Sequence, residues 1–337
     1  MMNEQQQESR GFQENGGNEP VFQVVGSPHL SNTSFTTRRM MIDVLIALIP
    51  LVLVAVYVFK FYAVKQLAIC LVSCLAAEAL FTRMRGKPVT LSDCSAAITG
   101  VILALSLPGT APWYIGVIGS FVGIGIGKVI FGGLGMNIFN PAMVGRAFVM
   151  ISFAGSMAAS GYLDPGATVD AITKATPLTA FKQGGIVTPL MALVVGNTNG
   201  SLGEVSAIAC LIGGIFLCLR RTASWEIPFG VIIATIILGG IADMTGAAPD
   251  WTVWHHLCGG ALLFGAFYIA TDPVTSPLTS RGKLIFGIGV GCFIMLLRLF
   301  SGYPEGVMFA VLFMNALTPL INRWTIPKPF GAVTQHT

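Results

Sequence analysis

The chain has 337 residues, of which 54% are hydrophobic and only 10% are charged, and it contains 40 glycines. This composition excludes an ordinary soluble domain and predicts a membrane protein, in which glycine lets helices pack closely or break inside the bilayer. The net charge of +4 then sets orientation in the membrane, and it does not indicate nucleic-acid binding.

The first 37 residues form a polar segment with the run NEQQQES. They lack the apolar core and the cleavage site of a secretory signal, so we expect this segment to stay in the cytoplasm. The seven cysteines lie in or beside apolar runs without CxxC spacing. We expect them to be packing residues, and we expect no metal site.

Apolar segments follow one another along the rest of the chain. About 20 apolar residues cross about 30 Å of hydrocarbon, so each segment is a candidate transmembrane helix. The sixth is a broken hydrophobic pair or one span preceded by a half-helix. The segments lie near residues 40–59, 64–81, 92–107, 113–131, 141–157, 186–219, 228–247, 254–270, 283–300 and 306–322.

Basic residues gather between alternate spans, as the positive-inside rule expects for an even number of spans. Both termini are therefore predicted to be cytoplasmic, and the segment from about 156 to 186 is predicted to face outward. The predicted cytoplasmic side holds Arg38, Arg39, Arg83, Arg85, Lys87, Lys128, Arg220, Arg221, Arg281, Lys283, Arg323 and Lys328, whereas the opposite side holds Lys60, Lys65, Lys174 and Lys182.

A weak internal repeat indicates two halves. GKVIFG at 127–132 recurs as GKLIFG at 282–287, and Asn-x-x-x-Pro occurs at 137–141 and again at 315–319. Five spans, an outward linker and five more spans would make the halves inverted. The sequence therefore predicts an all-α polytopic membrane protein of about ten helices. Its parts are the N-terminal segment 1–37, the first half 38–157, the linker 158–185, the second half 186–324 and the tail 325–337.

Transport folds with inverted halves place polar sites where helices break near mid-membrane. Proline, glycine and polar residues mark candidate breaks at residues 105–113, 136–143, 196–204 and 270–282.

The predicted outward linker contains VDAITKATPL, from Val169 to Leu178. Asp170, Thr173, Ala175 and Thr176 resemble the flavinylation motif Asp-x-x-Ser/Thr-x-Ala-Thr, in which the last threonine carries FMN through a phosphoester bond. The following Pro177 disfavours helix at Thr176, so we expect that hydroxyl on an extended, accessible backbone.

Two neighbouring residues bear on this interpretation. Thr168, in the triplet GAT at 166–168, is a rival acceptor, but it lacks the aspartate of the pattern. Lys174 stands where the family form of the motif has glycine, a departure that concerns the efficiency of the transferase and leaves the acceptor chemistry unchanged.

Longer stretches carry a wider resemblance that spans nearly the whole chain after about residue 25. They are SPHLSNTSFTTRRMMIDVLIALIP, GKVIFGGLGMNIFNPAMVGRAF, GSLGEVSA, ATDPVTSPLTSRGKLIFG and GYPEGVMFAVLFMNALTPLINR. Together they resemble the D subunit of the Rnf ion-translocating electron-transport complex. They are similar, more distantly, to the B subunit of the sodium-translocating NADH:quinone reductase.

This resemblance implies a multi-pass subunit of the bacterial cytoplasmic (inner) membrane with covalent FMN on the outward threonine. It also implies a non-covalent riboflavin within the membrane part. Electrons would pass between ferredoxin and NAD, coupled to Na⁺ or H⁺ movement, with the A, B, C, E and G subunits as partners and a flavin transferase for maturation. The chain would be part of a translocase that does not catalyse alone, because it has neither a nucleotide-binding glycine pattern nor a clustered-cysteine motif.

Several polar residues at membrane depth have two interpretations each. Asn137, Asn140 and Arg146 would line a flavin or ion cavity, or would bind orphan carbonyls at a broken helix. Asp272 would contribute to a cytoplasmic ion entrance, or would cap or anchor a loop. We expect Glu78, near the cytoplasmic end of its span, to pair with a neighbouring arginine.

Other functional classes stay open from the sequence. A solute permease or channel of inverted-repeat type would share the interrupted helices without any redox role, and a purely structural membrane subunit is a third class. A permease predicts no covalent chromophore and predicts transport by the isolated chain.

Overall fold

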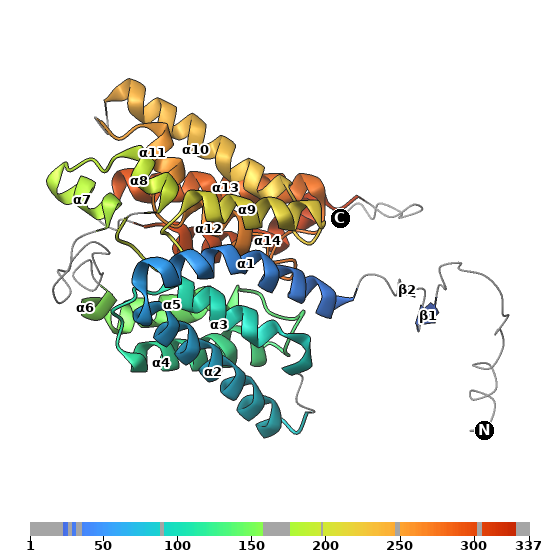
Figure 1. Cartoon of the computed structure of the whole chain (residues 1–337). Coiled ribbons are helices and arrows are strands. Elements are labelled where there is room, and N and C mark those ends of the chain that lie inside the picture. Colours follow the sequence, from blue (N-terminus) through green and yellow to red (C-terminus); the bar gives the residue numbers. More distant parts are fainter. Residues whose placement is uncertain are drawn as a thin grey trace, which may run out of the picture.

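The computed structural model describes residues 23–25, 29–31, 36–87, 91–157, 176–196, 198–246, 250–301 and 305–327. Two short strands, β1 (Gln23–Val25) and β2 (His29–Ser31), pair antiparallel ahead of the helices. The rest of the described chain is built from helices and their connections (Figure 1).

The helices of the first half lie together in Figure 1. A 3₁₀ turn precedes α3, and α4 continues directly into a π-helical turn, η3. These elements are α1 (Thr37–Phe59), α2 (Phe61–Met84), η2 (Leu91–Asp93), α3 (Ser95–Ser106), α4 (Trp113–Ile124), η3 (Gly125–Val129), α5 (Pro141–Ser152) and α6 (Ala154–Met157).

The helices after residue 176 form a second group, on the other side of α1 (Figure 1). A π-helical turn, η5, again follows a helix directly. The elements are α7 (Pro177–Gly184), α8 (Leu190–Val195), α9 (Ala207–Leu219), α10 (Glu226–Thr245), α11 (Val253–Cys258), α12 (Leu262–Phe264), η5 (Gly265–Ile269), α13 (Ser280–Phe300) and α14 (Val307–Thr325).

Helix lengths divide the predicted spans into two classes. Within the described ranges, five helices are long and apolar enough to cross a membrane: α1, α2, α10, α13 and α14. The predicted spans 92–107, 141–157 and 254–270 contain only short helices, and 12 residues, as in α3 and α5, extend about 18 Å. The polytopic, all-helical class is confirmed, with several spans broken and not continuous.

All four predicted breaks lie between helices. Residues 107–112 separate α3 from α4, residues 130–140 separate η3 from α5, residues 196–206 separate α8 from α9, and residues 270–279 separate η5 from α13. Two of these breaks touch: the Leu202 and Gly203 amides donate to the Leu107 and Leu105 carbonyls at 3.2 and 2.6 Å. The first and second helix groups therefore meet where their helices are interrupted.

Side-chain contacts also join the two groups through α1. The Tyr268 hydroxyl, on η5, donates to the carbonyls of Ala47 on α1 and Cys210 on α9, at 3.0 and 3.3 Å. Asp43 on α1 pairs with Arg220 at the end of α9, at 3.1 Å. Gly213 is required at this crossing because an added Cβ would overlap the Tyr268 hydroxyl and the Ala47 carbonyl.

The sequence repeat does not mark equivalent places in the fold. The GKVIFG copy lies in η3 and the turn after it, whereas GKLIFG lies in the first turns of α13. The Asn-x-x-x-Pro copies also differ, since one enters α5 and the other lies inside α14. The two motifs nevertheless meet, because the Asn140 amide donates to Asn315 Oδ1 at 3.2 Å.

Candidate functional site

Thr176 is the residue that caps the N-terminus of α7. Its backbone is extended, with φ −60° and ψ 156°, and Pro177 is the first residue of the helix. The Thr176 hydroxyl accepts from the Thr179 amide at 3.2 Å and lies 2.8 Å from the Thr179 hydroxyl. The predicted extended backbone is confirmed, because proline at the first helical position leaves the preceding residue outside the helix.

The prediction of an accessible hydroxyl at Thr176 is wrong for this structure, because only 5% of the residue is exposed. The cause is the docking of α7. Phe181 stacks on Trp251 with ring centroids 4.8 Å apart, and Lys182 Nζ donates to the Ser301 carbonyl at 2.8 Å. Burial, and then the charge of Arg298, lowers the pKa of Lys182 below its ordinary value.

The other motif residues, Asp170, Thr173 and Ala175, and the rival Thr168 lie outside the described residues.

A cavity of about 250 Å³ lies against Thr176, and we call it the Thr176 cavity. Two acidic side chains from distant parts of the chain, Glu204 and Glu305, reach its wall beside the threonine. Its full lining is Thr176, Pro177, Leu178, Leu193, Thr198, Asn199, Glu204, Gly260 and Glu305.

Arg146, on α5, binds both of these acids. Its Nη2 lies 3.2 Å from Glu305 Oε2 and 3.9 Å from Glu204 Oε1, and the residue is 6% exposed. Glu305 also accepts from the Ala261 amide at 3.0 Å. Arg146 thus pairs with two carboxylates. The sequence had predicted that it lines a flavin or ion cavity or binds orphan carbonyls at a broken helix.

Sequence reasoning missed Glu204 and Glu305, although each is a lone acid beside a glycine-containing break, in GSLGE and YPEG.

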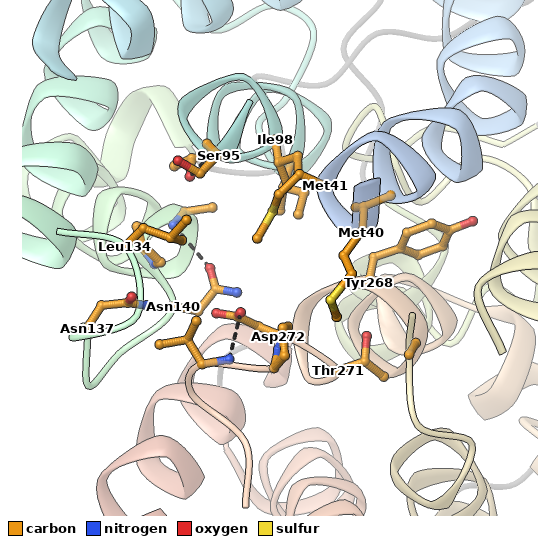
Figure 2. Close-up of a pocket in the computed structure, with 18 of the residues that line it drawn as sticks. Met40, Met41, Ser95, Ile98, Leu134, Asn137, Asn140, Tyr268, Thr271 and Asp272 are labelled. Atoms are coloured by element: carbon orange, nitrogen blue, oxygen red, sulfur yellow. Dashed lines mark hydrogen bonds between the residues drawn. The ribbon is translucent and has the colours of Figure 1, made fainter. Parts of the chain in front are cut away.

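A second cavity, of about 780 Å³, lies between α1, α3 and the breaks before α5 and α13 (Figure 2), and we call it the Asn140 cavity. Most of its wall is apolar, with Met40, Met41 and Ile98 among the residues drawn in Figure 2. Its polar lining includes Ser95, Lys128, Asn137, Asn140, Tyr268, Thr271 and Asp272. The structure therefore brings together Asn137, Asn140 and Asp272, and it places Arg146 elsewhere.

Asn140 lines the cavity and also binds backbone groups at a broken helix, whereas a flavin or ion in the cavity stays a prediction. It caps α5, accepting from the Ala142 and Met143 amides at 3.1 and 3.3 Å, and it donates to the Ile269 carbonyl at 3.3 Å. That carbonyl belongs to the last residue of η5, so Asn140 supplies a partner for a helix end inside the protein. Asn137 donates to the Phe139 carbonyl at 3.3 Å, within its own loop.

Asp272 acts as a loop anchor at the wall of the Asn140 cavity. It accepts from the Val274 amide and from the Thr275 hydroxyl, each at 3.2 Å. These bonds support the anchor interpretation and leave an ion entrance untested.

Glu78 pairs with a lysine, so the predicted arginine partner is wrong. Lys128 Nζ lies 2.5 Å from Glu78 Oε1 and also donates to the Ser95 hydroxyl. Both charged residues are only 2% exposed. The lysine reaches the acid because η3 carries it inward, a placement that the sequence does not reveal.

The described residues contain no cluster of three or more His, Cys, Asp or Glu that could hold a metal ion. All seven cysteines are free thiols. The polar groups that line the two cavities are hydroxyl, amide and carboxylate groups and the ammonium of Lys128.

Comparison with known proteins gives consistent matches over almost the whole chain. The sequence profile of the NQR2, RnfD, RnfE family matches residues 23–331. The D subunit of the Na⁺-translocating ferredoxin:NAD⁺ oxidoreductase complex of Acetobacterium woodii is 42% identical over 318 residues, covering 93% of this chain and 96% of the relative.

Two further relatives are similar over almost their whole length. The D subunit of the proton-translocating ferredoxin:NAD⁺ oxidoreductase complex of Clostridium ljungdahlii is 38% identical, covering 92% of this chain and 96% of the relative. The D subunit of the ion-translocating oxidoreductase complex of Halorhodospira halophila is 38% identical, covering 92% and 95%. These names include both sodium and protons as the translocated ion.

Proposed function

The chain belongs to the NQR2, RnfD, RnfE family, and on that premise we propose that it carries electrons through FMN bound covalently to Thr176. It is a membrane subunit of an ion-translocating ferredoxin:NAD⁺ oxidoreductase complex, as its relatives are named. The observation that carries the proposal is the position of Thr176, the last residue of the motif-like stretch, at the N-terminus of a helix.

The position of the Thr176 hydroxyl suits a phosphate. The N-terminal end of α7 presents the Thr179 amide, and the positive end of a helix stabilises a phosphoryl group. The Thr179 hydroxyl lies 2.8 Å from Thr176 Oγ1 and can donate to an ester oxygen, which accepts but does not donate. Replacing the hydroxyl proton by phosphorus therefore keeps both contacts.

Docked α7 covers the acceptor, so attachment of the flavin requires this helix to be undocked from Trp251. We propose that the flavin transferase acts before α7 docks, and that docking then fixes the group. The flavin would supply one- or two-electron chemistry, and the protein would supply its position. Covalent attachment also keeps the carrier at high effective concentration beside its partners.

The Asn140 cavity is suited to a non-covalent riboflavin. Like known small-molecule sites, it combines apolar walls with a few polar groups. Met40 and Met41 provide apolar walls, and Asn137 and Asn140 bring amide groups, which both donate and accept, to the cavity. We propose that riboflavin lies there, between the two helix groups.

Electron transfer through this subunit would be coupled to Na⁺ or H⁺ movement. Moving one charge against 100 mV requires about 2.3 kcal/mol, which a flavin redox step can supply. We propose that the A, B, C, E and G subunits of the complex provide the donor and acceptor centres, because this chain has no motif for an iron–sulfur cluster or a nucleotide.

The test is covalent flavin on the denatured chain made together with the flavin transferase. We expect a fluorescent band under ultraviolet light after denaturing electrophoresis, lost in Thr176→Ala and kept in the matched control Thr168→Ala. A band that survives Thr176→Ala contradicts the site. A wild-type chain without any band favours a permease.

A further inference from the structure

The start of α1 lies beside the end of α9, at one end of the crossing between the two helix groups. The helices are closest at Gly213, where an added Cβ would overlap the Ala47 carbonyl. Nearer the start of α1, Arg220 at the end of α9 binds Asp43. Contacts that move towards the start of one helix therefore move towards the end of the other, so α1 and α9 are antiparallel (Figure 1).

Three arginines and one aspartate line a pocket at this place, which we call the arginine pocket: Arg39, Asp43, Arg220 and Arg221. Asp43 accepts from Arg220 Nη2 at 3.1 Å and from the Thr222 hydroxyl at 3.2 Å. The carboxylate thus neutralises one guanidinium and holds it in place. The pocket keeps an excess of positive charge, which an anionic group would balance.

Arg221 has a backbone conformation that the turn alone does not explain. Its φ is +57°, in the left-handed region where glycine is the usual residue just after a helix. The Arg221 amide donates to the Cys218 carbonyl and the Thr222 amide to the Leu217 carbonyl, each at 3.1 Å, and glycine would make the same turn without strain. The arginine therefore gains its place from its side chain, which reaches the pocket.

An apolar face of α9 begins at the arginine pocket. Ile208, Ile212, Ile215 and Leu219 recur at spacings of four and three residues, so they share one side of the helix. They are 45% to 78% exposed, and Leu219 also lines the pocket. At 1.5 Å per residue this face extends about 16 Å, close to half of the roughly 30 Å hydrocarbon core of a bilayer. It has the length of an acyl chain in one leaflet.

A matching apolar face of α1 begins one turn after Arg39. It consists of Ile42, Ile46, Ile49 and Leu53, which are 39% to 63% exposed. At about 100° per residue, the exposed face of each helix lies about 110–120° from its contact with the other helix, in the same rotational sense. Because the helices are antiparallel, equal rotations place both faces on the same side of the pair.

We propose that the arginine pocket binds the headgroup phosphate of an anionic phospholipid whose acyl chains lie along the exposed faces of α1 and α9. Guanidinium groups donate paired hydrogen bonds to phosphate oxygens, and basic pockets between transmembrane helices suit anionic headgroups. The two apolar faces contact lipid in any case, and the pocket adds selection by charge.

The combination of features favours a phospholipid over other anions. Free phosphate would use the arginines and make no contact with the two apolar faces. An acidic segment of another subunit would need carboxylates joined directly to apolar groups that cover both faces. A phospholipid joins one phosphate to two acyl chains, which matches one pocket and two faces.

A lipid at this site would bridge the two helix groups, because α1 belongs to the first and α9 to the second. A ligand that binds only the folded state stabilises it by mass action. Added phosphatidylglycerol should therefore raise the temperature of thermal unfolding of the purified complex in detergent more than phosphatidylcholine does.

The direct experiment uses a phosphatidylglycerol with a photoactivatable group on an acyl chain, added to the purified complex. We expect mass spectrometry of the cross-linked peptides to find the label on α1 and α9. Unlabelled phosphatidylglycerol should compete with the probe, whereas phosphatidylcholine and inorganic phosphate should not. Labelling that inorganic phosphate abolishes, or that phosphatidylcholine competes for equally, overturns the proposal. The same holds if α1 and α9 stay unlabelled because another subunit covers them.

Variants separate this pocket from the general attraction of basic residues for anionic lipid. Arg39→Gln combined with Arg221→Gln should weaken labelling about tenfold. The matched control, Arg281→Gln combined with Arg323→Gln, removes the same charge from exposed residues of α13 and α14 and should leave labelling unchanged. Arg221→Gly should weaken labelling several-fold without lowering the temperature of unfolding, since glycine suits the left-handed backbone. Equal losses in the two double variants, or no loss in either, contradict the site.

Discussion

The two cavities differ in chemistry although both lie where helices are interrupted. The Thr176 cavity is small and has acids at its wall, which Arg146 and Arg298 neutralise. The Asn140 cavity is larger and mostly apolar, and amide groups line part of its wall. A broken helix leaves backbone groups to satisfy, and the side chains that satisfy them decide what each cavity can hold.

Under the proposed function, the two sites would hold different flavins. A phosphate-linked group brings negative charge, which the N-terminus of α7 at Thr176 would stabilise. Riboflavin is neutral, and the Asn140 cavity offers apolar walls with amide groups. Substitutions that affect one cavity and spare the other therefore show whether the two sites are separate.

The largest effect is expected from Arg146→Ala, which removes the cation shared by Glu204 and Glu305. Breaking a buried ion pair from one side costs about 3–5 kcal/mol, so thermal unfolding of the purified chain in detergent should occur at a clearly lower temperature. The control is Arg220→Ala, whose side chain is 41% exposed in its pair with Asp43 and whose loss should cost less than about 1 kcal/mol. Equal losses in the two variants would contradict the buried network.

A smaller effect is expected from Asn140→Ala, which affects the second cavity. The loss of the α5 cap costs about 1 kcal/mol, and the Ile269 carbonyl left without its partner costs about 1–3 kcal/mol. Non-covalent flavin released by denaturation should fall, while the covalent flavin on the chain stays. Asn137→Ala, which removes only a bond within its own loop, should be milder in stability. Loss of the covalent flavin in Asn140→Ala would show that the two cavities are not independent.

Tyr268→Phe tests the crossing between the helix groups. It removes the hydroxyl that donates to Ala47 and Cys210 and keeps the ring, so a destabilisation of about 1 kcal/mol is expected. Thermal unfolding of the purified chain in detergent is the measurement, and no change would mean that water replaces the bond.

The smallest effect concerns the docking of α7 and its dependence on pH. Because the pKa of Lys182 is lowered in the folded protein, the undocked state holds its proton more tightly, and docking strengthens as pH rises from the lowered pKa towards 10.5. Protection of α7 from protease should increase over that window, and Lys182→Met should remove the increase. Protection that falls with rising pH would contradict the assignment.

Sequence patterns predicted much of the fold, because the signals for spans and breaks are local. The apolar runs predicted the helices, and Pro108, Asn140 and Pro273 lie in breaks that the structure confirms. The length of each helix was less predictable, since the predicted span 254–270 contains α11, α12 and η5 and no single helix. Local hydropathy does not report where a helix ends inside the protein.

The sequence predicted only those parts of the candidate site that depend on a local motif. The prediction for Thr176 came from its neighbours in the chain, whereas Glu204 and Glu305 come together with Arg146 only through tertiary packing. The partner of Glu78 was missed for the same reason, because Lys128 is 50 residues away along the chain. Pairings between distant segments leave no local pattern in a single sequence.

Peptide mass spectrometry of the chain, isolated from its complex, detects the covalently attached flavin directly on the residue that carries it. We predict that the peptide containing Thr176 carries the mass of FMN on that residue, and that the peptide from Thr176→Ala carries none. An unmodified Thr176 in a preparation that retains covalent flavin at another residue would contradict the assignment of Thr176 as the electron-carrying site.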